Sequence, residues 1–243
     1  MENIETSDIT HDYFFKKKVI LLQRKKGFRF SIDAPLLAHF LPALPMEQAL
    51  EIGTGCGIVS MLALYKKKFA KIYGSEIQDS LSSLARINAG KNGFSLQFEV
   101  IPGDFNHTYN NEKIQGIRHI FSNPPYFKLN RGRLSPNPEI RAAKFETQLT
   151  LPQLMEKSRA ILDPNGSLYL VLPYDRYGEC TALSSETGFF IRKIREVFSF
   201  KDGKPERFLV QLTPYNVSTE EMNPLIIFNR QGYTEEMDEI LTG

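Results

Sequence analysis

Short apolar runs alternate with stretches of helical periodicity along the chain from about residue 33 onward. The apolar runs predict strands at 48–52, 70–76, 95–101, 116–122, 167–172, 189–198 and 206–213. The stretches between them predict helices at 33–41, 58–65, 80–92, 151–162 and 175–187. Asp33 and Asp79 stand where a helix N-cap is expected, and Gly93 stands where the third helix would close. The Asp-Pro-Asn-Gly run at 163–166 predicts a turn before the fifth strand.

Strand–helix alternation of this kind indicates right-handed βαβ units and therefore a parallel sheet with helices on both faces. The last two strands are joined only by the linker 200–205, which favours an antiparallel pair at the sheet edge. The predicted fold is α/β, a mostly parallel seven-stranded sheet with an antiparallel edge strand. It occupies residues 45–215, between an N-terminal extension at 1–44 and an acidic tail at 216–243. Residues 127–146 lack periodicity and predict a long loop that contacts the substrate.

Composition narrows the class of protein. Hydrophobic residues make up 42% of the chain, enough for a sizeable core, and no apolar run is long enough to predict a transmembrane helix. The first residues are polar and acidic, unlike a secretory signal. Cys56 and Cys180 are the only cysteines, which fits neither a zinc site nor a disulfide framework. A reducing, cytoplasmic setting is therefore expected.

The net charge is only +2, but basic residues are unevenly distributed. The N-terminal cluster comprises Lys16, Lys17, Lys18, Arg24, Lys25, Lys26 and Arg29. A second cluster comprises Lys128, Arg131, Arg133, Arg141 and Lys144. Two such clusters on a nearly neutral protein are typical of a local polyanion site, although charge runs also form ordinary solvated faces.

A glycine-rich turn follows the first predicted strand, in the sequence from Glu51 to Gly57. Gly53, Gly55 and Gly57 allow a tight turn and close approach of a ligand to the backbone. The spacing is G-x-G-x-G rather than the G-x-G-x-x-G of dinucleotide sites. An acid beside the turn suits a ligand with a positive amino group, such as the methionine part of S-adenosylmethionine. An ordinary strand–helix turn would also explain the glycines.

An acidic residue ends the second predicted strand, and another follows the third. Glu76 lies roughly 20 residues past the glycines, where a ribose-binding carboxylate is usual. Asp104 can accept a hydrogen bond from an adenine amino group, and Phe105 can pack near the ring. Pro-Gly-Asp is also common turn chemistry, which leaves a purely structural role for Asp104 open.

The residues Asn123-Pro124-Pro125-Tyr126 follow the fourth predicted strand. An exocyclic amino nitrogen is a poor nucleophile because its lone pair is delocalised. The Asn123 side-chain oxygen and the Pro124 carbonyl can accept its two hydrogens and favour a more nucleophilic geometry. Consecutive prolines stiffen the turn, and Tyr126 offers a face for stacking a flipped-out base. These residues predict methylation of an amino nitrogen, with Asn123, Pro124 and Tyr126 at the reacting group.

Together these motifs resemble the Rossmann-like class I methyltransferases over residues 45–215. The run from Phe28 to Ala38, combined with the Glu51 turn and NPPY, is similar to the bacterial tRNA(Val) adenine-N6 methyltransferase family. The resemblance implies S-adenosylmethionine as cofactor, tRNA as partner and the adenine 3′ of the anticodon (position 37) as target, with no metal and no membrane. It also implies that Phe30 and Asp33 help to cover the cofactor.

The two basic clusters are expected to hold phosphates of the substrate, through Lys16, Lys17, Arg24, Lys25, Lys128, Arg131, Arg133 and Arg141. Three alternatives remain open. Glutamine N5-methylation of release factors uses the same NPPY chemistry, but such enzymes usually carry a separate N-terminal domain. Other rRNA or DNA amino-methyltransferases share the short motifs. A non-catalytic RNA-binding module is the third alternative.

Overall fold

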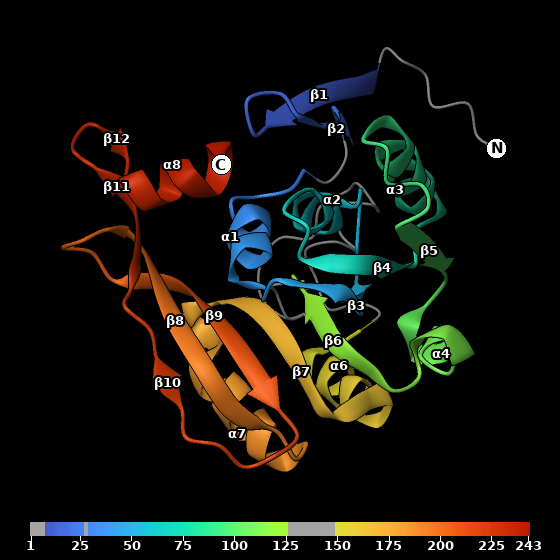
Figure 1. Ribbon diagram of the computed structural model, residues 1–243. Helices are drawn as coiled ribbons and strands as arrows, with labels where there is room; N and C mark the ends of the chain where they lie inside the picture. Colours follow the sequence, from blue (N-terminus) through green and yellow to red (C-terminus); the bar gives the residue numbers. More distant parts are fainter. Residues whose placement is uncertain (1–7, 27–28, 126–148) are drawn as a thin grey trace.

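The computed structural model describes residues 8–26, 29–125 and 149–243. One large mixed sheet is covered by helices on both faces, and a two-stranded hairpin lies outside the helices of one face (Figure 1). The strands are β1 (Ile9–Phe14), β2 (Val19–Arg24), β3 (Leu44–Ile52), β4 (Phe69–Glu76), β5 (Phe98–Pro102), β6 (Ile117–Ser122), β7 (Leu162–Pro173), β8 (Phe190–Phe200), β9 (Pro205–Thr213), β10 (Glu220–Glu221), β11 (Leu225–Asn229) and β12 (Gly232–Tyr233). The α-helices are α1 (Asp33–Phe40), α2 (Ile58–Tyr65), α3 (Asp79–Lys91), α4 (Phe105–Thr108), α6 (Leu151–Ile161), α7 (Tyr177–Glu186) and α8 (Glu235–Thr242), with 3-10 turns η2 (Glu112–Ile114) and η3 (Tyr174–Arg176).

The large sheet has the order β12-β11-β8-β9-β7-β6-β3-β4-β5, and β10 also pairs with β8. Strands β5, β4, β3, β6 and β7 are parallel, whereas β9 runs antiparallel to both β7 and β8. Ile52 is in register with Ser75 and with Ser122, so β3, β4 and β6 end at the same level. The loops that follow these strands therefore meet at one edge of the sheet.

Alternation along the strands builds two apolar layers. Ala49 packs with the helices α1, α2 and α3, whereas its neighbour Leu50 packs on the other face with α6. Phe121 and Ile120 of β6 divide between the two faces in the same way. The predicted α/β fold is confirmed, and the seven predicted strands all lie in this sheet.

Several local expectations were wrong. Asp33 and Asp79 are the first residues of their helices, and neither of the preceding cap residues makes a side-chain cap hydrogen bond. Residues 95–97 form turns rather than strand. The predicted turn at 163–166 lies inside β7, at an irregularity in its pairing with β6. The β8–β9 pair is antiparallel as predicted, but β10 and β11 cover the side of β8 that was expected to be the sheet edge.

Two segments at the ends of the chain are more structured than the sequence predicts. The N-terminal extension forms the β1–β2 hairpin and α1. Residues 216–243, expected to be an acidic tail, add β10, β11 and β12 to the sheet and end in α8, whose Met237 and Ile240 are buried. Within the described residues, no helix combines the length and apolar character that crossing a bilayer requires.

Candidate functional site

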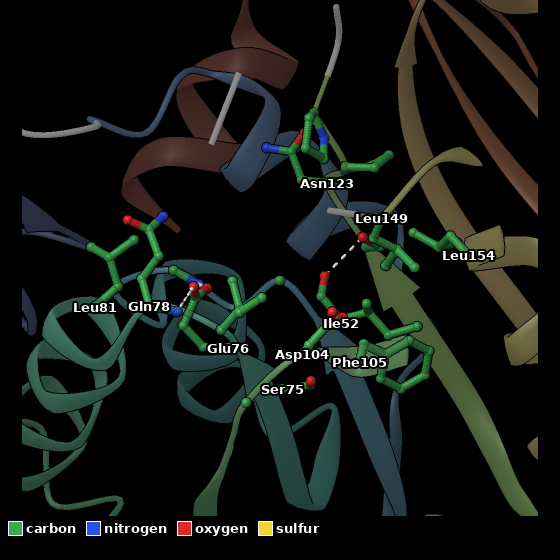
Figure 2. Close-up of a pocket in the computed structure, with 17 residues that line it drawn as sticks. Ile52, Ser75, Glu76, Gln78, Leu81, Asp104, Phe105, Asn123, Leu149 and Leu154 are labelled. Carbon is green, nitrogen blue, oxygen red and sulfur yellow. Dashed lines mark hydrogen bonds between the residues drawn. The ribbon is translucent and has the colours of Figure 1, made fainter. Parts of the chain in front are cut away.

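A pocket opens at the carboxyl ends of β3, β4, β5 and β6, the edge at which ligands bind in open α/β sheets. Its empty space is about 780 Å³, part of it open to solvent. The lining residues are Ile52, Gly53, Gly55, Ser75, Glu76, Ile77, Gln78, Leu81, Gly103, Asp104, Phe105, Ser122, Asn123, Pro124, Pro125, Leu149 and Leu154. Figure 2 shows Asn123 across the pocket from Glu76, Gln78 and Leu81.

The glycine-rich turn forms one wall of this pocket. Gly53, Gly55 and Gly57 have φ of +71°, +58° and +85°, a left-handed conformation that favours glycine. The backbone N–H of Gly53 donates to the carbonyl of Ser75 (2.9 Å), which ties the turn to β4. A Cβ added to Gly53 or Gly55 would meet nothing within 4 Å. Both glycines therefore present bare backbone to open space, whereas Gly57 lies at the start of α2 against Ala85.

Glu76 is the acidic residue most firmly held at the pocket. Its Oε2 accepts a hydrogen bond from the N–H of Gly55 (2.8 Å), and its Oε1 accepts one from the N–H of Gln78 (2.9 Å). The carboxylate is 6% exposed and joins the glycine turn to the end of β4. Asp104 lies on the same wall, where its Oδ1 accepts from the N–H of Asn106 (2.8 Å) and caps α4. Its neighbour Phe105 is buried and lines the pocket.

Glu51 lies beneath the turn rather than on the pocket wall. Its buried Oε2 accepts hydrogen bonds from the hydroxyls of Thr54 (2.6 Å) and Ser60. Burial raises the pKa of the Glu51 carboxyl to about 7, although the bonds from Ser60 and Thr54 oppose that rise. Its contact with a ligand therefore stays a prediction.

Asn123, Pro124 and Pro125 form the opposite wall, directly after β6. A guanidinium that the sequence did not point to supports them from outside the pocket. Arg176 is 4% exposed, and its Nη1 donates to the Pro125 carbonyl (3.3 Å). Its Nε and Nη2 donate to the two carboxylate oxygens of Glu179 (3.1 and 3.2 Å). Arg176 lies in η3, directly after β7, and it reaches Pro125 because β7 pairs with β6. No motif in the sequence points to Arg176.

The other predicted site residues lie elsewhere. Phe30 packs against Phe14, and the buried Asp33 forms an ion pair with Arg207; neither side chain is among those that line the pocket. The basic residues Lys16, Lys17, Arg24 and Lys25 belong to the hairpin turn and to the end of β2. Tyr126, Lys128, Arg131, Arg133, Arg141 and Lys144 lie outside the described residues.

The methyltransferase small domain family matches residues 29–188 of the chain. The chain belongs to this family. Relatives of this methyltransferase include a tRNA1(Val) (adenine(37)-N6)-methyltransferase of Parabacteroides distasonis, 25% identical, with 96% of this chain and 97% of the relative aligned. A protein of the same name from Porphyromonas gingivalis is 26% identical over 91% of this chain and 90% of its own.

Solved methyltransferase structures share the fold of this methyltransferase. A predicted O-methyltransferase of Agrobacterium tumefaciens superposes with a TM-score of 0.66 and 18% identity, over 86% of this chain and 94% of its own. The M. capricolum TrmK protein, in complex with S-adenosyl-homocysteine, gives a TM-score of 0.54 and 11% identity, over 79% of this chain and 72% of its own. At these identities the likeness establishes the class I methyltransferase fold.

Proposed function

We propose that this methyltransferase uses S-adenosylmethionine to methylate N6 of an adenine in tRNA, at position 37 of tRNA1(Val). The observation that carries the proposal is the convergence of two predicted motifs on one pocket. The amino-nitrogen motif at Asn123-Pro124-Pro125 lies across the pocket from the glycine turn and Glu76. Relatives that bear this activity in their names align over at least nine tenths of both chains, which supports the choice of substrate.

The described residues fit S-adenosylmethionine. The open backbone of Gly53 and Gly55 leaves room for the amino-acid part of the cofactor. The carboxylate of Glu76 suits the ribose hydroxyls, and that of Asp104 suits the adenine amino group. The apolar side chains of Leu81 and Phe105 suit the flat faces of the adenine ring. When bound, the cofactor supplies an electrophilic methyl group on sulfur.

The protein's own part in the reaction is to position the target nitrogen. The Asn123 Oδ1 and the Pro124 carbonyl accept the two amino hydrogens, which directs the nitrogen lone pair toward the cofactor. Alignment of this kind supplies much of the acceleration in group transfer. The amino proton becomes acidic once the nitrogen carries the methyl group and leaves without a strong base. Tyr126 is proposed to stack on the extruded adenine.

Asn123→Ala tests this mechanism. We expect the affinity for S-adenosylmethionine to stay near that of the wild type, whereas kcat falls on the order of a hundredfold, the usual cost of one lost positioning hydrogen bond. Calorimetry measures cofactor binding, and mass spectrometry of digested tRNA measures N6-methyladenosine. Asn165→Ala, at an exposed position of β7, is the matched control.

Release factor, rRNA and DNA are tested beside tRNA with the same enzyme. Methylation of release factor but not of tRNA would refute the tRNA assignment and keep the amino-nitrogen mechanism. Near-normal turnover by Asn123→Ala on every substrate would refute the mechanism itself.

A further inference from the structure

Two lysine runs that are far apart in the sequence meet at the tip of the N-terminal hairpin. Lys16, Lys17 and Lys18 form the β1–β2 turn, and a second run of three lysines, 66–68, follows α2. Phe15 joins them, because its buried ring stacks on that of Tyr65 with centroids 4.7 Å apart. The two lysine runs therefore lie near each other in space, with Lys66 Nζ 4.6 Å from the centroid of the Phe15 ring.

One of these lysines has a structural role. Lys68 Nζ donates to the carbonyls of His39 (2.7 Å) and Leu41, at the end of α1. Burial lowers the pKa of Lys68 to about 8, and the positive charge of Lys66 lowers it further in the same direction. Lys68 therefore closes α1 and is not counted in the surface.

The remaining lysines and one aromatic residue define what we call the hairpin-tip surface: Tyr13, Lys16, Lys17, Lys18, Lys66 and Lys67. All five lysines are exposed, and none takes part in an ion pair within the part of the chain that the structure describes. Tyr13 is 51% exposed, with Lys17 Nζ 5.8 Å from its ring centroid. Glu239 lines the hollow beside Phe15 and Lys66 and offsets part of the charge.

The backbone at this surface is strained. Among the described residues, positive φ at positions other than glycine occurs only at Phe15 (+51°), Lys16 (+55°), Lys17 (+70°) and Lys67 (+52°). Glycine or asparagine adopts this conformation with less strain than lysine. The protein nevertheless carries charged side chains there, and backbone strain concentrates where side chains serve a function.

The surface lies at the end of the sheet opposite the pocket. The carbonyl of Lys68 accepts from the N–H of Leu44, where β3 starts, whereas Ile52 at the end of β3 lines the pocket. A strand of that length spans roughly 25–30 Å at about 3.3 Å per residue. A ligand confined to the pocket cannot reach the hairpin tip, but a folded RNA can span both places.

We propose that the hairpin-tip surface binds the phosphate backbone of the tRNA at a distance from the methylated base. The inference rests on the proposed function. Exposed lysines around a stacking aromatic ring are typical of RNA contacts, in which phosphates provide affinity. An anionic lipid surface would need an accompanying apolar face, and this surface offers a single aromatic ring.

The test is the triple variant Lys16→Asn/Lys17→Asn/Lys67→Asn. Asparagine removes the charge while tolerating the left-handed backbone, so the fold is expected to persist. The charge-matched control is Lys201→Asn/Lys204→Asn/Arg230→Asn, which removes the same charge from exposed turns after β8 and β11, at the opposite end of the sheet from the hairpin tip. Thermal unfolding of both variants checks the fold. Fluorescence anisotropy with labelled tRNA1(Val) measures binding across a salt series, independently of turnover.

We expect the triple variant to bind tRNA about tenfold more weakly and to lose up to about three from the slope of log K against log salt. KM for tRNA rises while kcat at saturation stays unchanged. A short single-stranded RNA holding the same adenine should be methylated equally by the variant and the wild type, because it does not reach the hairpin tip.

Unchanged tRNA affinity in the triple variant, or equal losses in both variants, would overturn the inference while the proposed function stands. Loss of binding to vesicles containing anionic phospholipid, with tRNA binding intact, would also overturn it and identify a lipid surface instead. If the wild-type enzyme methylates no tRNA, the proposed function is refuted. The tRNA affinities of the wild type and the triple variant, measured by anisotropy, then test the hairpin-tip surface independently of methylation.

Discussion

The buried carboxyl of Glu51 offers a quantitative test of how the cofactor is held. Its pKa of about 7 means that about one tenth of the protein carries an ionised Glu51 at pH 6 and about half does at pH 7. If only the ionised form holds the ammonium group of S-adenosylmethionine, cofactor affinity should rise about fivefold between these pH values. The amino group of the ligand, with a pKa of about 7.7–8.0, stays mostly protonated over this range.

Isothermal titration calorimetry of wild type and Glu51→Gln measures this effect. In buffers of different ionisation enthalpy at pH 6, binding to the wild type should release close to one proton, because the bound cation lowers the pKa of Glu51. The variant should bind more weakly at pH 7 and show neither the pH dependence nor the proton release. A flat wild-type profile, with equal affinity in both proteins, would refute the reasoning and leave Glu51 as an acceptor for Thr54 and Ser60.

The same shift predicts a stability change in the absence of cofactor. The pKa in the folded protein lies above the ordinary value of 4.5, so the unfolded state loses this proton first as the pH rises. Stability therefore falls between about pH 4.5 and pH 7, by roughly 3 kcal/mol from this group, and is level above that range. Chemical denaturation of Glu51→Gln should lack this decline.

Two further variants test groups that hold the site in place. Arg176→Lys keeps the positive charge but loses the planar guanidinium that bonds Pro125 and Glu179. We expect kcat to fall about tenfold while the affinity for the cofactor stays unchanged. An equal loss of kcat and of cofactor affinity would contradict this positioning role. Asn88→Asp turns an amide that donates to the carbonyls of Leu22 (3.1 Å) and Cys56 (2.8 Å) into an acceptor. It should destabilise the protein by roughly 3 kcal/mol and weaken cofactor binding, whereas an unchanged free energy of unfolding would contradict the loss of these two hydrogen bonds.

The central part of the sheet, from β3 to β9, was predictable because each of these strands contains apolar positions in a recognisable pattern, and the glycine-rich turn follows the first of them. Gly53, Glu76, Asp104 and Asn123 all follow or end such strands, and parallel strands bring their carboxyl ends to one edge. Periodicity and topology together therefore predicted the pocket without knowledge of any side-chain contact.

The N-terminal hairpin was not predictable by the same means. Its turn contains no glycine, asparagine or proline, since Phe15, Lys16 and Lys17 take the left-handed conformation instead. Turn chemistry gave no signal there. The hairpin is held by tertiary contacts, with the side-chain amides of Asn88 and Asn92 pairing the backbone of β2 at Leu22 and Ile20.

The position of Glu51 depends on the alternation of side chains along β3, which motif spacing alone does not describe. Along β3, Ala49 faces the layer of α1 and α2, and Ile52 faces the opposite layer and the pocket. Because side chains alternate along a strand, Glu51 lies on the same face as Ala49, beneath α2. There the hydroxyl of Ser60 donates a hydrogen bond to its carboxylate. We propose that a carboxylate there acts on the cofactor through the glycine turn above it, either by its charge or by fixing Thr54. The pH dependence of cofactor binding separates these two, because only the charge changes as Glu51 titrates near neutral pH.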